Sequence, residues 1–166
     1  DNLVILSGNS NVPLARKISE YLKIKLNEDS IPTMFANTEY HSRIHENLRG
    51  KDVFIINSGC VNIEKCLSVN DIIFETLILV DACRRSMASS VNIIMPNYPY
   101  ARGDKKDEPR APIPAKLVAP TESLEPNPKV QALARDSRGS LPSYVFNYYQ
   151  GLNVTRAFTM LTMLKL

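Results

Sequence analysis

The sequence predicts one α/β domain with a mainly parallel sheet. An apolar run at residues 2–6 is followed by turn-forming residues and then by apolar residues at helical spacing. Two further apolar runs, at residues 52–58 and 91–95, enclose a long helical segment. A strand, a helix and a second strand of these lengths form a right-handed parallel crossover. A chain of 166 residues, 44% of them hydrophobic, can bury the core of one such domain.

The first strand leads into a helix near Val12. Asn11 can cap this helix, and Pro13 falls in its first turn, where a missing N–H costs nothing. We interpret residues 8–11 as a capping turn rather than a phosphate cradle, because a lone glycine is a weak phosphate signal. Residues 33–49 stay ambiguous, since their apolar spacing fits both a helix and a strand.

The helix at about residues 70–87 is the clearest element of the sequence. Ser68 or Asn70 can cap it, Asp71 lies at the positive end of its dipole, and two arginines lie at the negative end. Its body, residues 72–80, is apolar on most sides, so we expect it to be largely buried, together with Cys83.

The second half of the chain has a different composition. Nine of the eleven prolines lie between Pro96 and Pro142. A helix that begins at Pro114 is ended by Pro120, which has no N–H and disfavours the α conformation before it. Residues 120–142 have the composition of a linker, and residues 154–166 fit an amphipathic helix.

Charge and cysteine content exclude several classes of protein. A net charge of +3 is too small to indicate a nucleic-acid or membrane partner. Three cysteines without a C-x-x-C pair favour free thiols in a reducing compartment, so we expect a cytoplasmic protein. The apolar runs are shorter than a membrane span, and the N-terminus has no signal-peptide pattern.

The segment Tyr98–Arg110, here called the basic loop, carries the densest set of chemical groups. It follows the carboxyl end of a predicted strand, where ligands bind in open α/β sheets. Four of its side chains are cations suited to phosphate oxygens: Arg102, Lys105, Lys106 and Arg110. Three others are carboxylates that could hold Mg²⁺ through water: Asp104, Asp107 and Glu108. Mixed charge is also usual in a solvated turn, so composition alone leaves both interpretations open.

The sequence NYPYARGDKKDEPRAPIPAKLVA at residues 97–119 resembles the ATP-loop signature of ribose-phosphate pyrophosphokinases. Further matches follow in register at the opening VILSGNSN and at residues 35–39, 46–56, 69–71 and 77–82. The resemblance covers about residues 2–119. We therefore predict that residues 1–119 form the N-terminal domain of this family, and that residues 120–166 are a divergent tail.

The resemblance implies a phosphoribosyltransferase-like, three-layer fold that is incomplete here. It implies an enzyme family that transfers the β,γ-diphosphoryl group of ATP to the 1-hydroxyl of ribose 5-phosphate, with Mg²⁺, for nucleotide biosynthesis. By the same resemblance, a hairpin would reach the adenine of a neighbouring subunit through Phe35, Asn37 and Glu39. The basic loop would hold ATP through Arg102, Asp104, Lys105, Lys106 and Asp107. The implied cofactors are ATP and Mg²⁺, and the implied partners are synthetase subunits in a homo- or hetero-oligomer.

The sequence departs from the family pattern at several positions. Gly103 replaces a glutamine and should loosen the basic loop, Thr38 stands where the hairpin often has glycine, and Pro114 replaces a serine or threonine. About five extra residues lengthen the loop around residues 63–67. The likeness also makes His41 and His45 exposed strand residues, and two histidines are too few for zinc.

Three family segments have no counterpart in these 166 residues: the metal-binding Asp-Leu-His, the flap with the catalytic lysine and arginine, and the acidic ribose-phosphate loop. The resemblance therefore predicts no catalytic and no metal-ligating residue in this sequence. It predicts an ATP half-site without turnover. The alternative is a non-catalytic subunit that binds full-length synthetases through the hairpin.

Overall fold

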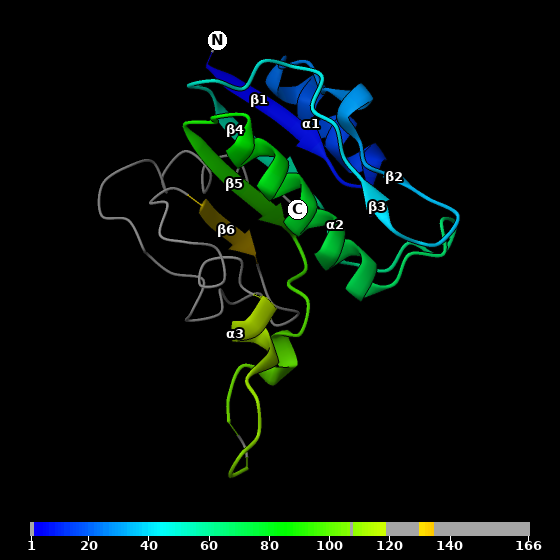
Figure 1. Ribbon diagram of the computed structural model, residues 1–166, viewed down its shortest axis with the longest axis vertical. Coiled ribbons are helices and arrows are strands. Elements are labelled where there is room, and N and C mark those ends of the chain that lie inside the picture. The colour runs from blue at the N-terminus through cyan, green and yellow to red at the C-terminus, as the bar shows by residue number, and fades with distance from the viewer. Residues whose placement is uncertain (1, 107, 119–129, 135–166) are drawn as a thin grey trace.

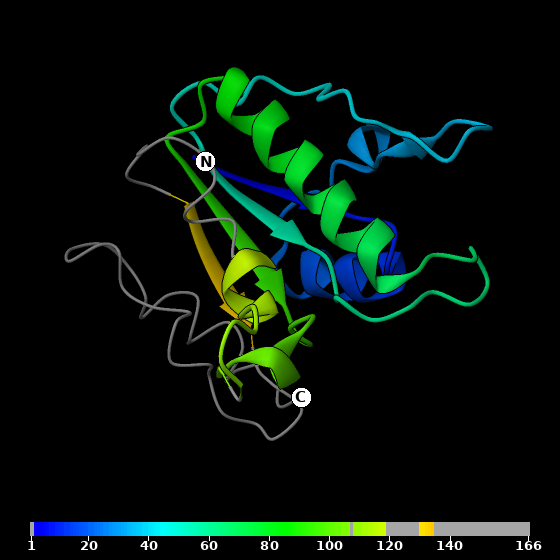
Figure 2. The same ribbon diagram turned by 60° about the horizontal axis from the view of Figure 1, so that its bottom comes forward.

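The computed structural model describes residues 2–106, 108–118 and 130–134. Its centre is a parallel sheet of order β1-β4-β5-β6. The strands are β1 (Leu3–Ser7), β4 (Asp52–Ile56), β5 (Ser90–Met95) and β6 (Val130–Ala134). Their arrows point the same way in Figures 1 and 2, so their carboxyl ends share one edge. The three predicted strands and their parallel pairing are confirmed.

Two helices cover opposite faces of this sheet and make three layers (Figure 2). Helix α1 (Val12–Leu22) packs on one face against Ile5, Ile56 and Ile94. Helix α2 (Val69–Arg85) packs on the other face. Its side chains Leu79, Val80 and Cys83 are buried in one cluster with alternate residues of strands β1, β4 and β5. Because successive residues of a strand point to opposite faces, each central strand serves both layers.

Shorter elements connect these layers. A two-stranded antiparallel hairpin, residues 33–41, contains β2 (Thr33–Met34) and β3 (Tyr40–His41). The remaining short helices are η1 (Glu28–Ser30), η2 (Ala101–Gly103) and α3 (Pro114–Val118). Within the described part of the chain, no helix has the length and apolar character needed to cross a membrane.

The predicted helix ends are confirmed in detail. The Asn11 side chain accepts a hydrogen bond from the Leu14 N–H at 3.1 Å, with proline in the first turn of α1. For α2 the structure selects Ser68 as the cap, because its hydroxyl accepts from the Asp71 N–H while the Ser68 N–H donates to the Asp71 carboxylate at 2.8 Å. Hydrogen bonds that the Ser68 hydroxyl and then the Ser68 N–H donate to the Asp71 carboxylate hold the pKa of Asp71 below its usual range.

Some expectations need correction. Residues 130–134, assigned to a linker-like segment, form β6 beside β5, because a strand can add to the open edge of β5 whatever the composition around it. His41 is an exposed strand residue as expected, whereas His45 is exposed but follows β3 outside any strand. The amphipathic helix expected at residues 154–166 lies outside the described residues.

Replacing Ser68 with alanine tests the cap of α2. The variant Ser68→Ala loses the hydroxyl acceptor of the Asp71 N–H, and we expect it to lower the free energy of unfolding by about 1 kcal/mol. Ser68→Thr keeps a hydroxyl and should stay within about 0.5 kcal/mol of the parent. Urea unfolding followed by circular dichroism measures both. Equal midpoints for the alanine and parent proteins would contradict this role of Ser68.

Candidate functional site

Three loops meet at the carboxyl edge of the sheet. They follow β1, β4 and β5, and the strands bring them together because parallel neighbours end at the same edge. In open parallel sheets this edge is where ligands bind. The basic loop is the third of these loops, so its predicted place at this edge is confirmed.

A buried polar cluster joins the first two loops. The Asn57 side-chain carbonyl, directly after β4, accepts hydrogen bonds from the hydroxyl and the N–H of Ser10. The Ser10 hydroxyl in turn accepts from the Ser58 N–H at 2.6 Å. The Asn57 amide donates to the Thr76 hydroxyl of α2 at 2.9 Å. Through these bonds the loops after β1 and β4 are fixed to each other and to α2.

The carboxylate of Glu75 is the charged member of this cluster. Glu75 lies on α2, and none of its surface is exposed. It accepts two bonds from the Asn9 N–H, at 3.0 and 3.1 Å, and further bonds from the side-chain amides of Asn9 and Asn57. Burial raises the pKa of Glu75, although its bonds with Asn9 and Asn57 and the charge of Lys65 act in the opposite direction.

The loop that precedes α2, where we expect extra residues, packs onto this cluster. The Asn62 side-chain amide donates to the carbonyls of Asn9 and Ser10 at 3.1 and 3.2 Å. The Lys65 ammonium donates to the Asn9 side chain at 2.7 Å. The insertion loop, defined here as residues 60–67, is therefore tied to the loop after β1. The apolar periodicity of the sequence does not predict this cluster, although the single acidic residue in the apolar body of α2, Glu75, is a signal of it.

The loops after β4 and β5 approach each other through backbone atoms. The Asn97 N–H donates to the Ser58 carbonyl at 3.1 Å. Gly59 lies in the left-handed region at φ +69°, and a Cβ there would stand 2.0 Å from the Asn97 carbonyl oxygen. Only glycine satisfies both constraints, so Gly59 sets the distance between these two loops.

The predicted phosphate-binding side chains lie in and after η2. Arg102, Lys105 and Lys106 are exposed, and Asp104 is half-buried. Asp107 lies outside the described residues. The described members of the predicted set therefore lie within five residues of one loop after β5, and their cationic side chains are exposed to solvent.

Gly103 and Pro114, two positions at which we expect departures from the family pattern, lie close together in this turn. A Cβ added to Gly103 would stand 2.9 Å from Cδ and 3.2 Å from Cγ of Pro114. The Pro114 ring therefore occupies the space that a side chain at position 103 would need. The expectation that Gly103 loosens the loop is not supported by this packing, because the glycine allows close contact with α3.

The hairpin residues form a second group. The Phe35 N–H donates to the Glu39 carbonyl at 2.8 Å, and the Asn37 side chain accepts from the Glu39 N–H at 3.3 Å. The Phe35 ring is 53% exposed and lies 5.7 Å from the ring of His41. Thr38 adopts φ +69°, the left-handed conformation that favours glycine, which explains why glycine suits this position.

The hairpin and the basic loop both approach the first turn of α2. Thr38 and Glu39 line a cavity together with Asn70, and the Tyr100 hydroxyl donates a hydrogen bond to Asn70. Within the described part of the chain, no group of three or more histidine, cysteine or acidic side chains is placed to hold a metal ion.

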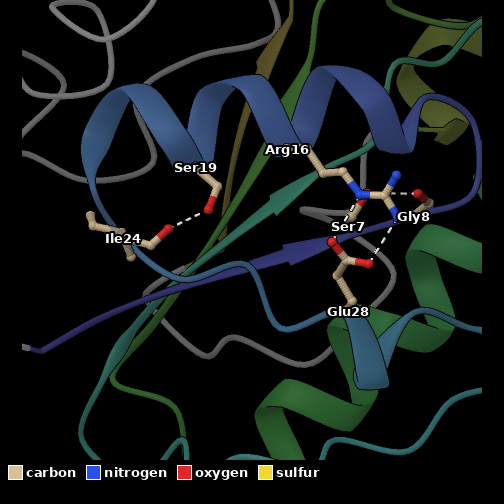
Figure 3. Close-up of polar contacts among 6 residues, drawn as sticks. All are labelled: Ser7, Gly8, Arg16, Ser19, Ile24 and Glu28. Carbon is tan, nitrogen blue, oxygen red and sulfur yellow. Dashed lines mark hydrogen bonds and ion pairs between the residues drawn. The ribbon is translucent and has the colours of Figure 1, made fainter.

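A large open cavity lies elsewhere, between α1 and η1. Its volume is about 750 Å³, and its wall includes Arg16, Ser19 and Glu28. Figure 3 shows that Arg16 and Glu28 pair through two bonds, of 2.8 and 2.9 Å, and that the Ser19 hydroxyl bonds to the Ile24 carbonyl. The bond to Arg16 holds the pKa of Glu28 below its usual range. This pairing leaves the basic loop as the stronger candidate for an anionic ligand.

Comparisons with known proteins agree with the fold and with the motif. The family described as the N-terminal domain of ribose phosphate pyrophosphokinase matches residues 3–122. The ribose-phosphate pyrophosphokinase of Campylobacter jejuni is 47% identical over 115 residues, which are 69% of this chain and 35% of that protein. The crystal structure of phosphoribosylpyrophosphate synthetase from Mycobacterium smegmatis superimposes with a TM-score of 0.73 at 30% identity. That match covers 89% of this chain and 46% of the other, so the chain spans less than half the length of these two relatives.

The polar cluster generates a prediction about Glu75. Glu75→Leu removes the acceptor of the Asn9 N–H and of the Asn9 and Asn57 side-chain amides, so we expect the free energy of unfolding at pH 7 to fall by about 1–3 kcal/mol. Thr76→Val, which removes one neutral hydroxyl of the same cluster, should cost less. Chemical unfolding measures both variants, and equal stability of Glu75→Leu and the parent would contradict this account.

The stability difference between the parent and the Glu75 variant should depend on pH, and the direction of the pKa shift determines its sign. A raised pKa means that the folded state binds the Glu75 proton more tightly than the unfolded chain does. The contribution of Glu75 to stability is therefore complete below its unfolded-state pKa of about 4.3, and it falls as pH rises through its folded-state value. The stability deficit of Glu75→Leu relative to the parent should therefore narrow from acid to neutral pH. Unfolding curves at several pH values that show a widening deficit would refute the raised pKa.

Proposed function

The chain belongs to the ribose-phosphate pyrophosphokinase family, and from this premise we propose that it binds Mg²⁺-ATP through the basic loop and does not complete the family's reaction by itself. The observation that carries the proposal is the exposed cationic turn after β5. Arg102, Lys105 and Lys106 are exposed in the loop that follows β5, inside the segment that matches the family.

Charge and geometry support phosphate binding at this turn. The exposed cations of this turn are accessible to a ligand from solvent. Their guanidinium and ammonium groups can donate charge-assisted hydrogen bonds to phosphate oxygens. Behind the turn, the Tyr98 hydroxyl donates to the Ala115 carbonyl at 3.0 Å and holds the loop against α3. The loop thus offers exposed cationic side chains on an anchored backbone.

The residues present fit ATP better than they fit a separate magnesium site. Mg²⁺ prefers a few carboxylates, water and phosphate oxygens. The described loop offers Asp104 and Glu108, and neither belongs to a cluster of three metal-binding side chains within the described residues. We therefore propose that Mg²⁺ enters with the phosphates of ATP and is held through water by these carboxylates. When bound, the ion would neutralise part of the phosphate charge.

Turnover needs more than this half-site. Phosphoryl transfer depends on positioning both substrates and on stabilising charge at the transferred group. The resemblance assigns ribose 5-phosphate binding and metal binding to segments that these 166 residues do not contain. We propose that this polypeptide holds ATP without transferring its diphosphoryl group. A cytoplasmic location would suit its free thiols, two of them exposed.

ATP affinity tests the proposal. We expect the 166-residue chain to bind Mg²⁺-ATP in isothermal titration calorimetry. The double variant Lys105→Ala Lys106→Ala should weaken binding by about tenfold or more, because each lost charge-assisted bond is worth roughly 1.5–3 kcal/mol. The control Lys17→Ala Lys25→Ala removes the same charge from exposed lysines near α1, one of them in the wall of the large cavity. An equal loss in both double variants would refute binding at the basic loop.

Turnover is measured separately. We expect no AMP release that depends on both ATP and ribose 5-phosphate. Release above the level of Lys105→Ala Lys106→Ala would show that the chain is active and would overturn the proposed half-site.

A second candidate function is a subunit that joins full-length synthetases. The observation that favours it is the exposed apolar surface of the hairpin, where Met34 is 48% and Phe35 is 53% exposed. Large exposed apolar side chains on a projecting element are typical of interaction sites. If this function is correct, the hairpin binds a synthetase subunit in an oligomer and does not bind a small-molecule ligand of its own.

Co-purification distinguishes this candidate. A full-length synthetase should retain the tagged chain, and Phe35→Ala should lower retention at least several-fold, as expected for a buried aromatic anchor worth about 1–2 kcal/mol. Tyr21→Ala is the matched control, since Tyr21 is a 59% exposed aromatic on α1. A purely monomeric elution profile in the mixture would eliminate the candidate.

A further inference from the structure

One hydrogen bond connects the basic loop to the start of α2. The Tyr100 hydroxyl donates to the side-chain carbonyl of Asn70 at 2.6 Å, across 30 residues of sequence. Tyr100 is also the residue from which η2 begins. The contact therefore joins the turn that carries Arg102 to a helix on one face of the sheet.

The Asn70 end of this bond is rigid. Asn70 is the second residue of α2 after its cap, Ser68, and the reciprocal bonds with Asp71 fix the first turn. Further along, the helix is held by the buried carboxylate of Glu75 and by the core contacts of Leu79. An acceptor on such an element stays in place, so it can define the position of a mobile donor.

The Tyr100 end needs such support. Its backbone adopts φ +58° and ψ +16°, a left-handed conformation that is unfavourable for a residue with a Cβ. The Gly103 N–H closes the turn on the Tyr100 carbonyl at 2.9 Å. The position of Tyr100 therefore determines where η2 starts, and Arg102 follows two residues later.

We infer that Asn70 is a positioning residue for the basic loop: it accepts the Tyr100 hydrogen bond, holds η2 in its observed conformation and so places Arg102 for the phosphates of ATP. The inference rests on the proposed function for its ligand. Its structural half, the restraint of η2, can be measured without ATP.

Limited trypsin digestion of the native 166-residue chain measures the restraint. Loss of one hydrogen bond should make the turn open more often, so Asn70→Ala and Tyr100→Phe should each speed cleavage after Arg102 by about fivefold. The double variant should be cleaved no faster than either single variant, because both remove the same bond. Cleavage after Lys17 on α1 and the thermal midpoint should not change, which separates local opening from general unfolding.

ATP titration measures the consequence. Asn70→Ala and Tyr100→Phe should each weaken Mg²⁺-ATP binding by a similar factor of about five, again without further loss in the double variant. Tyr21→Phe, which removes an exposed hydroxyl from α1, should bind ATP like the parent.

The outcomes separate the inference from the proposed function. Parent-like cleavage after Arg102 in both single variants overturns the inference, as do additive effects in the double variant. Faster cleavage with unchanged ATP affinity also overturns it, because the restraint would then not serve the ligand. If the parent chain itself does not bind Mg²⁺-ATP, the proposed function fails, and the cleavage rates alone decide whether Asn70 positions the turn.

Discussion

The burial of the Glu75 carboxylate is the constraint on which the carboxyl edge of the sheet depends. A carboxylate that is removed from water must accept hydrogen bonds from the protein, because a buried charge without such partners costs several kcal/mol of folding free energy. Here the donors are the backbone and side chain of Asn9 and the amide of Asn57. Asn9 and Asn57 belong to the loops after β1 and β4, so their hydrogen bonds to Glu75 fix both loops against α2. The insertion loop then adds Lys65 as a nearby positive charge.

This fixed edge leaves the basic loop as the part with freely exposed cations. Its backbone is nevertheless anchored at three places: Tyr100 on α2, Tyr98 on α3 and Gly103 against Pro114. The Pro114 ring fills the space that a side chain at position 103 would need, so this anchor depends on the absence of a Cβ at Gly103. Anchored backbone and free side chains suit a ligand such as a phosphate chain, whose recognition relies on several cations that converge on its oxygens.

Much of the fold could be predicted from local signals. The caps of α1 and α2 and the parallel strands were readable because side-chain capping and apolar runs act over short distances. The hairpin of residues 33–41 was ambiguous, because strands of two residues carry too little periodicity. β6 was missed, since its partner strand rather than its own composition defines it. The Glu75 cluster and the bond between Asn70 and Tyr100 join residues far apart in sequence, and single-sequence patterns do not contain such pairs.

A buried polar cluster fixes the sheet edge, and we propose that the basic loop takes the nucleotide phosphates. Nuclear magnetic resonance titration of the ¹⁵N-labelled chain with Mg²⁺-ATP tests it most directly. The account predicts saturable shifts at the amides of residues 100–106, and little change at Asn9, whose N–H is already committed to Glu75. Shifts that instead concentrate around Arg16 and Glu28, in the wall of the large cavity, would contradict it.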